Sequence, residues 1–138
     1  MKKTVWWLRV VGGFYLLLTL MNLYGLFLSD GQLFRDILPY ASEGTVVRAF
    51  MDAWMVFIFE LAALAVAMLY AARQPEQSRM LMLAVIAAEI LRGVVADAIW
   101  ITRGYSAASY IPFIVIHLVI IVTGIMALPK KVEKAGEP

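Results

Sequence analysis

The chain has 138 residues, of which 63% are hydrophobic and only 16% are charged, with a formal net charge of +2 and a mean hydropathy of +0.83. This balance differs from that of a soluble globular domain and predicts an integral membrane protein. The absence of cysteine excludes disulfides, thiolate metal sites and cysteine nucleophiles. Basic patches interleaved with aromatic residues are absent, so nucleic-acid binding is not expected.

Four apolar stretches follow one another along the chain. Each is long enough to cross about 30 Å of hydrocarbon at about 1.5 Å per residue. We therefore predict one membrane domain over residues 1–138, an all-α four-helix bundle with antiparallel neighbours. The predicted spans are residues 5–28, 46–72, 79–102 and 108–128.

Two of the predicted links are short, which favours antiparallel neighbours. Residues 73–78 contain Pro75, which stops a helix, and residues 104–107 begin with a glycine. The outer link, residues 29–45, has apolar residues at the spacing of one helix face. It is either a short helix lying on the membrane surface or a partly ordered loop.

Most lysines and arginines outside the spans fall on the side that holds both chain ends. By the positive-inside rule, both termini are expected to be cytoplasmic, in a multi-pass protein of the inner (cytoplasmic) membrane. Aromatic residues near the span ends, with Trp6 and Trp7 inside and Tyr105 and Tyr110 outside, are typical of anchors at the membrane surface.

The third span contains the motif Glu89-x-x-Arg92-Gly93-x-x-x-Asp97. An ionisable side chain inside a bilayer is costly, so it normally faces the bundle interior, finds a partner and often marks a functional site. Gly93 either lets another backbone approach or lowers the packing bulk.

Counting from the inner ends of the spans places Glu60, Glu89, Arg92 and His117 within roughly 5 Å in height. They form one layer near the midplane, in which we predict a salt bridge between Glu60 and Arg92. Two glutamates against one arginine leave a negative charge. A protonated glutamate, a charged His117 or a bound cation would compensate it.

A second polar layer is predicted nearer the outside. Asp52 and Asp97 lie at similar depth there, with Asn22 on the first span. The two carboxylates are expected to face each other. Asp97 needs a partner from another element, because Arg103 lies six residues away, on another helix face.

Alanines recur at four-residue spacing on the second and third spans, where they let helices approach closely. This spacing predicts that these two spans form a tight pair. The residues are Ala63, Ala67 and Ala71, with Ala84 and Ala88.

Motifs spread over nearly the whole length carry a family resemblance. They are residues 6–12 followed by Phe14-Tyr15, Pro75-Glu76-Gln77 with Arg79, the third-span motif, Arg103-Gly104-Tyr105, and His117 running into Val122-Thr123-Gly124. On these residues the chain resembles the BphX-like family, small bacterial membrane proteins first noticed beside genes of aromatic-hydrocarbon degradation and without an assigned activity. The resemblance implies a four-helix membrane protein linked to aromatic or lipid metabolism, and it supplies no catalytic residues.

The principal functional hypothesis is a site for a small hydrophobic compound, aromatic or lipid-like, in which polar groups lie at the base of an apolar cavity. If the protein is an enzyme, Glu60, Glu89, Asp97 and His117 are the candidates for isomerase-like acid–base chemistry. The residues expected to contact the compound are Asn22, Asp52, Trp54, Phe57, Glu60, Glu89, Arg92, Asp97, Trp100 and His117.

Two alternatives from other classes stay open. The protein is alternatively a proton-coupled small-molecule transporter acting as a homodimer, since membrane carboxylates commonly carry the coupling proton. It is otherwise an accessory subunit whose charged cluster only holds the helices together. No metal or cofactor is expected, because close-spaced metal motifs are absent and Arg92 would repel a cation.

Overall fold

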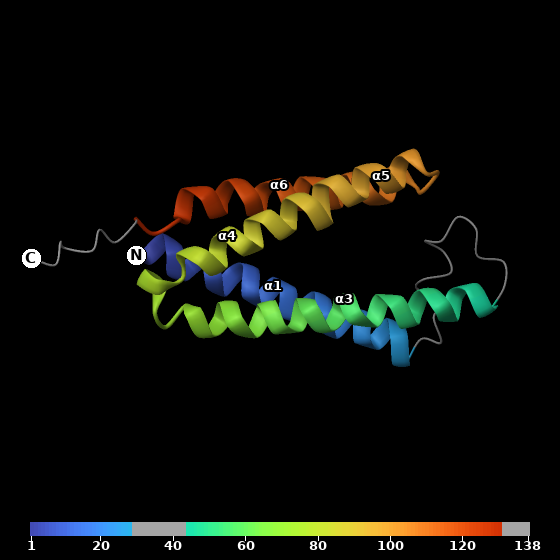
Figure 1. Cartoon of the computed structure of the whole chain (residues 1–138), viewed down its shortest axis with the longest axis horizontal. Coiled ribbons are helices and arrows are strands. Elements are labelled where there is room, and N and C mark those ends of the chain that lie inside the picture. The colour runs from blue at the N-terminus through green and yellow to red at the C-terminus, as the bar shows by residue number, and fades with distance from the viewer. Residues whose placement is uncertain (29–43, 131–138) are drawn as a thin grey trace, which may run out of the picture.

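A computed structural model describes residues 1–28 and 44–130, and these residues are all-helical apart from turns (Figure 1). The helices are α1 (Lys2–Phe27), α3 (Gly44–Ala71), the short 3-10 helix η1 (Pro75–Gln77), α4 (Arg79–Ala88), η2 (Glu89–Val95), α5 (Ala96–Thr102) and α6 (Ala107–Ala127).

Three of these helices, α1, α3 and α6, are long and apolar enough to cross a membrane. Their bounds lie close to those predicted from the apolar stretches. In the link before α4, Pro75 opens η1, and Gly104 in the turn before α6 has a φ of 93°, which suits glycine. The predicted surface helix falls in residues 29–43, outside the described residues.

The third predicted span is one helical segment with the expected ends, but it is not a regular α-helix. Its middle part, η2, is a π-helix of seven residues. π-Helical turns are rare in proteins, and those that occur often lie at functional sites. The sequence did not predict η2, because the apolar spacing that favours a helix does not distinguish the two hydrogen-bonding patterns.

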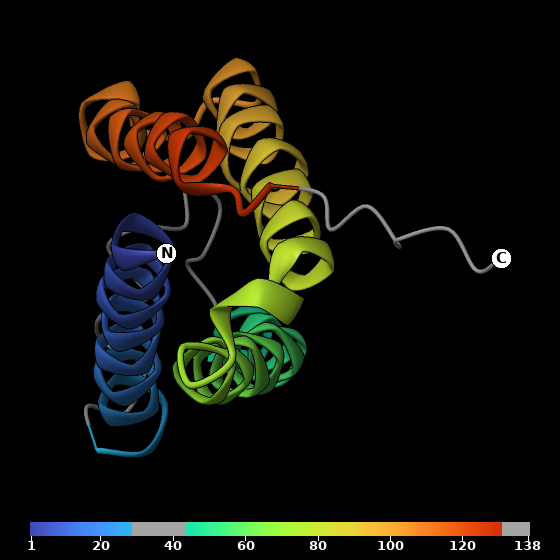
Figure 2. The same cartoon turned by 90° about the vertical axis from the view of Figure 1, so that its left-hand side faces the viewer.

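The helices associate as two pairs. α1 packs along α3, and α6 packs along η2 and α5, while α1 also contacts α6. The end-on view shows α1 beside α3 and α6 beside α5 (Figure 2). The predicted tight pairing of the second and third spans is therefore wrong. The close approach on α3 is instead to α1 and involves Ala65, whose carbonyl oxygen would lie 3.3 Å from a Cβ built on Gly12.

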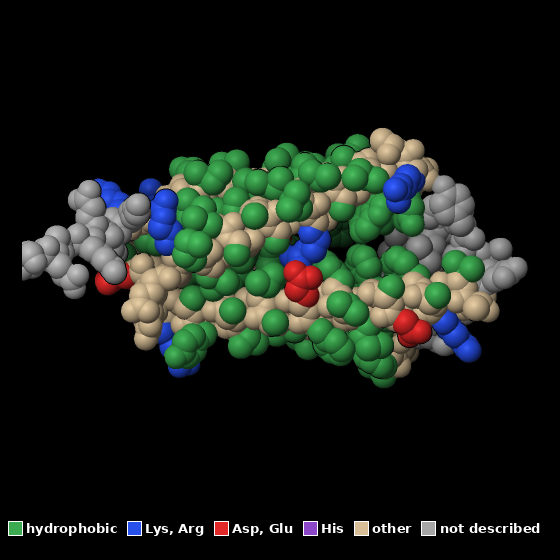
Figure 3. All heavy atoms as spheres, in the orientation of Figure 1, with side chains coloured by type: hydrophobic (Ala, Val, Ile, Leu, Met, Phe, Trp, Pro, Cys, Tyr) green, Lys and Arg blue, Asp and Glu red, His purple; other side chains and the backbone are tan. Residues whose placement is uncertain are grey.

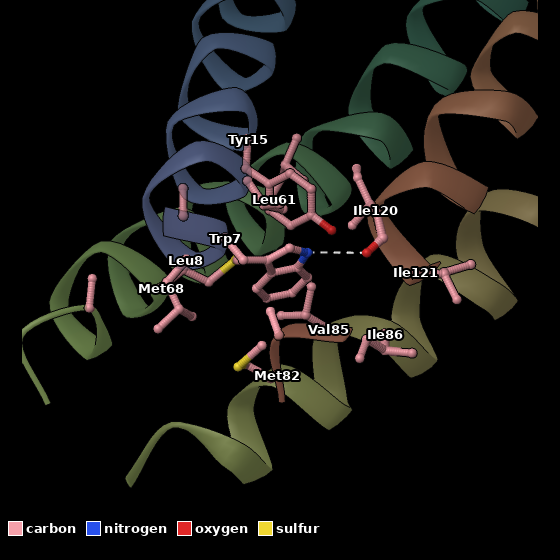
Figure 4. Packing of buried hydrophobic residues seen from close by; sticks show 14 residues of the cluster. Trp7, Leu8, Tyr15, Leu61, Met68, Met82, Val85, Ile86, Ile120 and Ile121 are labelled. Carbon is pink, nitrogen blue, oxygen red and sulfur yellow. Dashed lines mark hydrogen bonds between the residues drawn. The ribbon is translucent and has the colours of Figure 1, made fainter. Parts of the chain in front are cut away.

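The main hydrophobic core lies where α1, α3, α4 and α6 meet (Figure 4). Trp7 is at its centre, only 6% exposed, and its Nε1 donates a hydrogen bond to the Ile120 carbonyl, 3.2 Å away. Trp7 is thus a core residue, and its predicted role as a surface anchor is wrong. Trp6, one residue earlier on the helix, is 69% exposed.

Candidate functional site

The imidazole of His117, on α6, lies against a stripe of buried residues on η2 and α5. These are Glu89, Gly93 and Asp97, spaced four residues apart on one helix face. Nδ1 of His117 is 2.7 Å from Oε2 of Glu89, and Nε2 is 3.7 Å from Oδ2 of Asp97. The motif therefore provides a carboxylate at each ring nitrogen.

Gly93 makes this arrangement sterically feasible. A Cβ added there would overlap the imidazole ring of His117. Because only glycine lets the ring lie this close to the helix backbone, Gly93 is part of the site.

Tyr15 of α1 completes the hydrogen bonding of Glu89. Its hydroxyl donates to Oε1, and both side chains are 1% exposed. Glu89 thus joins α1, η2 and α6 in one buried network. Tyr15 was not among the site residues predicted from the sequence, because it is uncharged. Its depth was a usable signal, since it lies about 13 residues into α1, level with the predicted midplane layer.

Arg92 links this network to α3. Its Nη1 is 3.4 Å from Oε1 of Glu60, and its Nη2 is 3.9 Å from Oε1 of Glu89. The predicted bridge from Glu60 to Arg92 is confirmed. The guanidinium carbon also lies over the rings of Phe57, at 4.9 Å, and Tyr15, at 5.9 Å, as in cation–π pairs.

The side chain of Glu60 is 57% exposed and that of Arg92 is 21% exposed. Figure 3 shows acidic and basic spheres in contact midway along a largely hydrophobic face. The network therefore extends from a buried end at Asp97 to an exposed end at Glu60.

Asp97 has a buried carboxylate oxygen to which no described residue donates a hydrogen bond. It is 4% exposed, and its Oδ2 has no hydrogen-bond partner within the described ranges, because 3.7 Å to His117 is too long. Asp52 is exposed on α3, so the prediction that it faces Asp97 is wrong. Asp52 on α3 and Asp97 on α5 belong to different helix pairs. Counting residues from the span ends predicts depth in the membrane but not which helices are neighbours.

The charges of the network do not balance. Glu60, Glu89 and Asp97 are opposed by Arg92 alone unless His117 is protonated. Buried uncompensated charge is costly, so a further hydrogen-bond donor beside the network would stabilise it. Residues 1–28 and 44–130 contain no group of three or more acidic or histidine side chains arranged to hold a metal ion.

The predicted aromatic residues lie together beyond Arg92. Trp54 donates from Nε1 to Oδ1 of Asn22 at 2.9 Å, and its ring centroid is 4.6 Å from that of Phe57 and 6.2 Å from that of Trp100. The rings contact one another across α3 and α5, so a bound molecule would have to lie against them or between them.

The match to a protein-family model agrees with the motifs. No curated protein and no solved structure matches the chain. The family model described as BphX-like matches residues 1–133, nearly the whole length. This chain therefore belongs to the BphX-like family.

Proposed function

We propose that the protein spans the inner membrane four times and binds a small hydrophobic compound that carries a hydrogen-bond donor. The lengths and apolar character of α1, α3 and α6 support membrane insertion. The fourth span would be the segment from α4 to α5. Successive segments reverse direction along the long axis (Figure 1), which supports antiparallel spans with both termini on the basic, cytoplasmic side.

The observation that carries the binding proposal is the buried Oδ2 of Asp97 without a donor. Leaving such an acceptor unpaired costs about 1–3 kcal/mol. A hydroxyl or amine of a bound compound would remove this cost. Trp100, three residues along α5, and Trp54 opposite it offer aromatic faces for the apolar body of the compound.

The same residues have the groups needed for acid–base chemistry. His117 lies 2.7 Å from Glu89, within the distance needed to exchange a proton with that carboxylate, while Asp97 lies 3.7 Å from its other ring nitrogen. Binding is the primary proposal, and isomerase-like chemistry on the bound compound would add to it.

Native mass spectrometry of the detergent-extracted protein tests the proposal. We expect wild type to carry a co-purified small molecule that is lost in Asp97→Asn, because the amide no longer accepts as a carboxylate does. Asp52→Asn, an exposed aspartate of α3, is the matched control and keeps the molecule. An empty wild-type spectrum, or equal retention in both variants, would contradict the binding role.

A second candidate is proton-coupled transport by a homodimer. The hydrogen-bonded path from Tyr15 through Glu89 to His117 favours it, since such chains can pass protons. It predicts that vesicles with an imposed pH gradient take up substrate, and that Glu89→Gln stops the uptake. An accessory subunit is the remaining alternative, favoured by the way the network joins α1, α3, η2 and α6.

A further inference from the structure

Two hollows adjoin each other where α1 begins and α6 ends. The first, of about 600 Å³, has Lys2, Lys3 and Lys130 in its wall, and we call it the basic hollow. The second, of about 460 Å³, runs between α1 and α6, and we call it the apolar groove. They share Lys3, Met126 and Ala127, so one molecule can occupy both. Both volumes fall in the range of about 300–1,000 Å³ that is usual for ligand sites.

The basic hollow attracts anions. Among the described residues that line it, three lysines are opposed by one acidic residue, Glu76. The lysine side chains are exposed, so their ammonium groups can turn toward a phosphate. Figure 3 shows basic side chains at this end of the molecule.

Hydrogen bonds between distant parts of the chain hold the walls of the basic hollow. Oγ1 of Thr4 donates to the Ala127 carbonyl at 2.7 Å, and Nη1 of Arg79 donates to the Pro129 carbonyl at 2.6 Å. They attach the end of α6 to α1 and α4. The hollow is therefore formed before any ligand arrives, which lowers the entropic cost of binding.

The apolar groove suits a hydrocarbon chain. Large hydrophobic side chains in its wall are strongly exposed, among them Trp6 at 69%, Val10 at 58%, Val119 at 56% and Met126 at 68%. An exposed apolar groove that ends in a cluster of lysines matches an amphiphile with an anionic head. A free phosphate would leave the groove empty, and a neutral lipid would leave the lysines without a counter-charge.

We propose that the basic hollow and the apolar groove together bind one anionic phospholipid. Its phosphate lies among Lys2, Lys3 and Lys130, and an acyl chain lies along Trp6. Basic pockets between helices near the cytoplasmic surface bind lipid head groups in this manner. The proposal uses the membrane placement suggested above and is independent of the compound near Asp97.

Quenching of tryptophan fluorescence by brominated lipids tests this site. The variant with Trp54→Phe and Trp100→Phe keeps Trp6 and Trp7, both in the wall of the groove. It is reconstituted in phosphatidylcholine vesicles that contain increasing mole fractions of either brominated phosphatidylglycerol or brominated phosphatidylcholine. The mole fraction giving half-maximal quenching should be roughly 100-fold lower for the anionic lipid, since each lysine near a lipid charge contributes about 1 kcal/mol, about fivefold.

Charge variants assign the preference to this hollow. Each of Lys2→Gln, Lys3→Gln and Lys130→Gln should reduce the preference about fivefold. Arg48→Gln, which removes an exposed charge at the start of α3, should leave it unchanged. Equal quenching by the two lipids, no quenching by either, or the same loss in Arg48→Gln would overturn the proposal.

Discussion

Glu89 of η2 and His117 of α6 face each other across the helix pair, with 2.7 Å between Oε2 and Nδ1. The other oxygen of Glu89 accepts from Tyr15 on α1, and Arg92 lies 3.9 Å from it. One buried carboxylate thus connects three helical elements. The structure identifies Glu89 as the centre of the site.

Tyr15→Phe should lower the free energy of unfolding by about 1.5–3 kcal/mol, because hydrogen bonds to charged groups contribute this much and the ring keeps its packing. Denaturant titration in detergent measures the loss. Tyr24→Phe, in the same helix but 57% exposed, is the control and should change stability by less than about 0.5 kcal/mol. Equal losses in the two variants would show that the bond to Glu89 is not stabilising.

Gly93→Ala should displace the His117 ring, because the new Cβ would overlap it. The chain has one histidine, so the ¹⁵N resonances of a labelled imidazole report on His117 alone. These resonances should shift in Gly93→Ala. We also expect a loss of about 1–3 kcal/mol, which is usual for overpacking.

The matched control for that experiment is Gly13→Ala, where a new Cβ has no neighbour within 4 Å. In α1 it should leave the His117 resonances unchanged and stabilise the helix by roughly 0.5–1 kcal/mol, as alanine does relative to glycine. An unshifted His117 signal in Gly93→Ala would mean that the ring does not lie over Gly93.

Glu60 and Arg92 should contribute unequally to stability. Glu60→Gln removes a single ion-pair contact, the one with Arg92, so its cost should be the smaller of the two. Arg92→Gln should cost more, because Arg92 also lies near the buried Glu89 and over the Phe57 ring. Unfolding of both variants in the same detergent compares them, and a larger effect at Glu60 would contradict this order.

The charge swap Glu60→Arg with Arg92→Glu should not restore the stability lost in Arg92→Glu. The swap regenerates an ion pair with residue 60, but it places a carboxylate beside Glu89, which is 1% exposed. A double-mutant cycle on unfolding measures the coupling. Full recovery would favour the accessory-subunit alternative, in which only the pair itself is needed.

Gly124→Ala should destabilise the core by about 1–3 kcal/mol. A Cβ on Gly124 would lie 2.8 Å from Cζ2 of Trp7 and 3.1 Å from Cγ1 of Ile86. The Trp7 indole cannot move away without losing its hydrogen bond to Ile120. A thermal melt that matches wild type would show that the indole can shift at no cost.

Features that depend on local pattern could be predicted from the amino-acid sequence. The ends of the apolar stretches predicted the helix bounds. The constant rise of a helix per residue showed that each stretch is long enough to cross a membrane. The same constant rise brought Glu60 level with Arg92, and their salt bridge followed from depth alone.

The pairing of the helices could not be predicted from the sequence and is seen only in the folded chain. Alanine spacing on α3 suits close approach to any neighbour, so it could not distinguish α1 from α4. The same limit applied to Trp7, whose burial depends on α6, and to Tyr15 and Asp97, whose partners come from distant parts of the chain. Side-chain contacts between helices depend on their rotation and pairing, and neither is encoded in the apolar pattern of one helix.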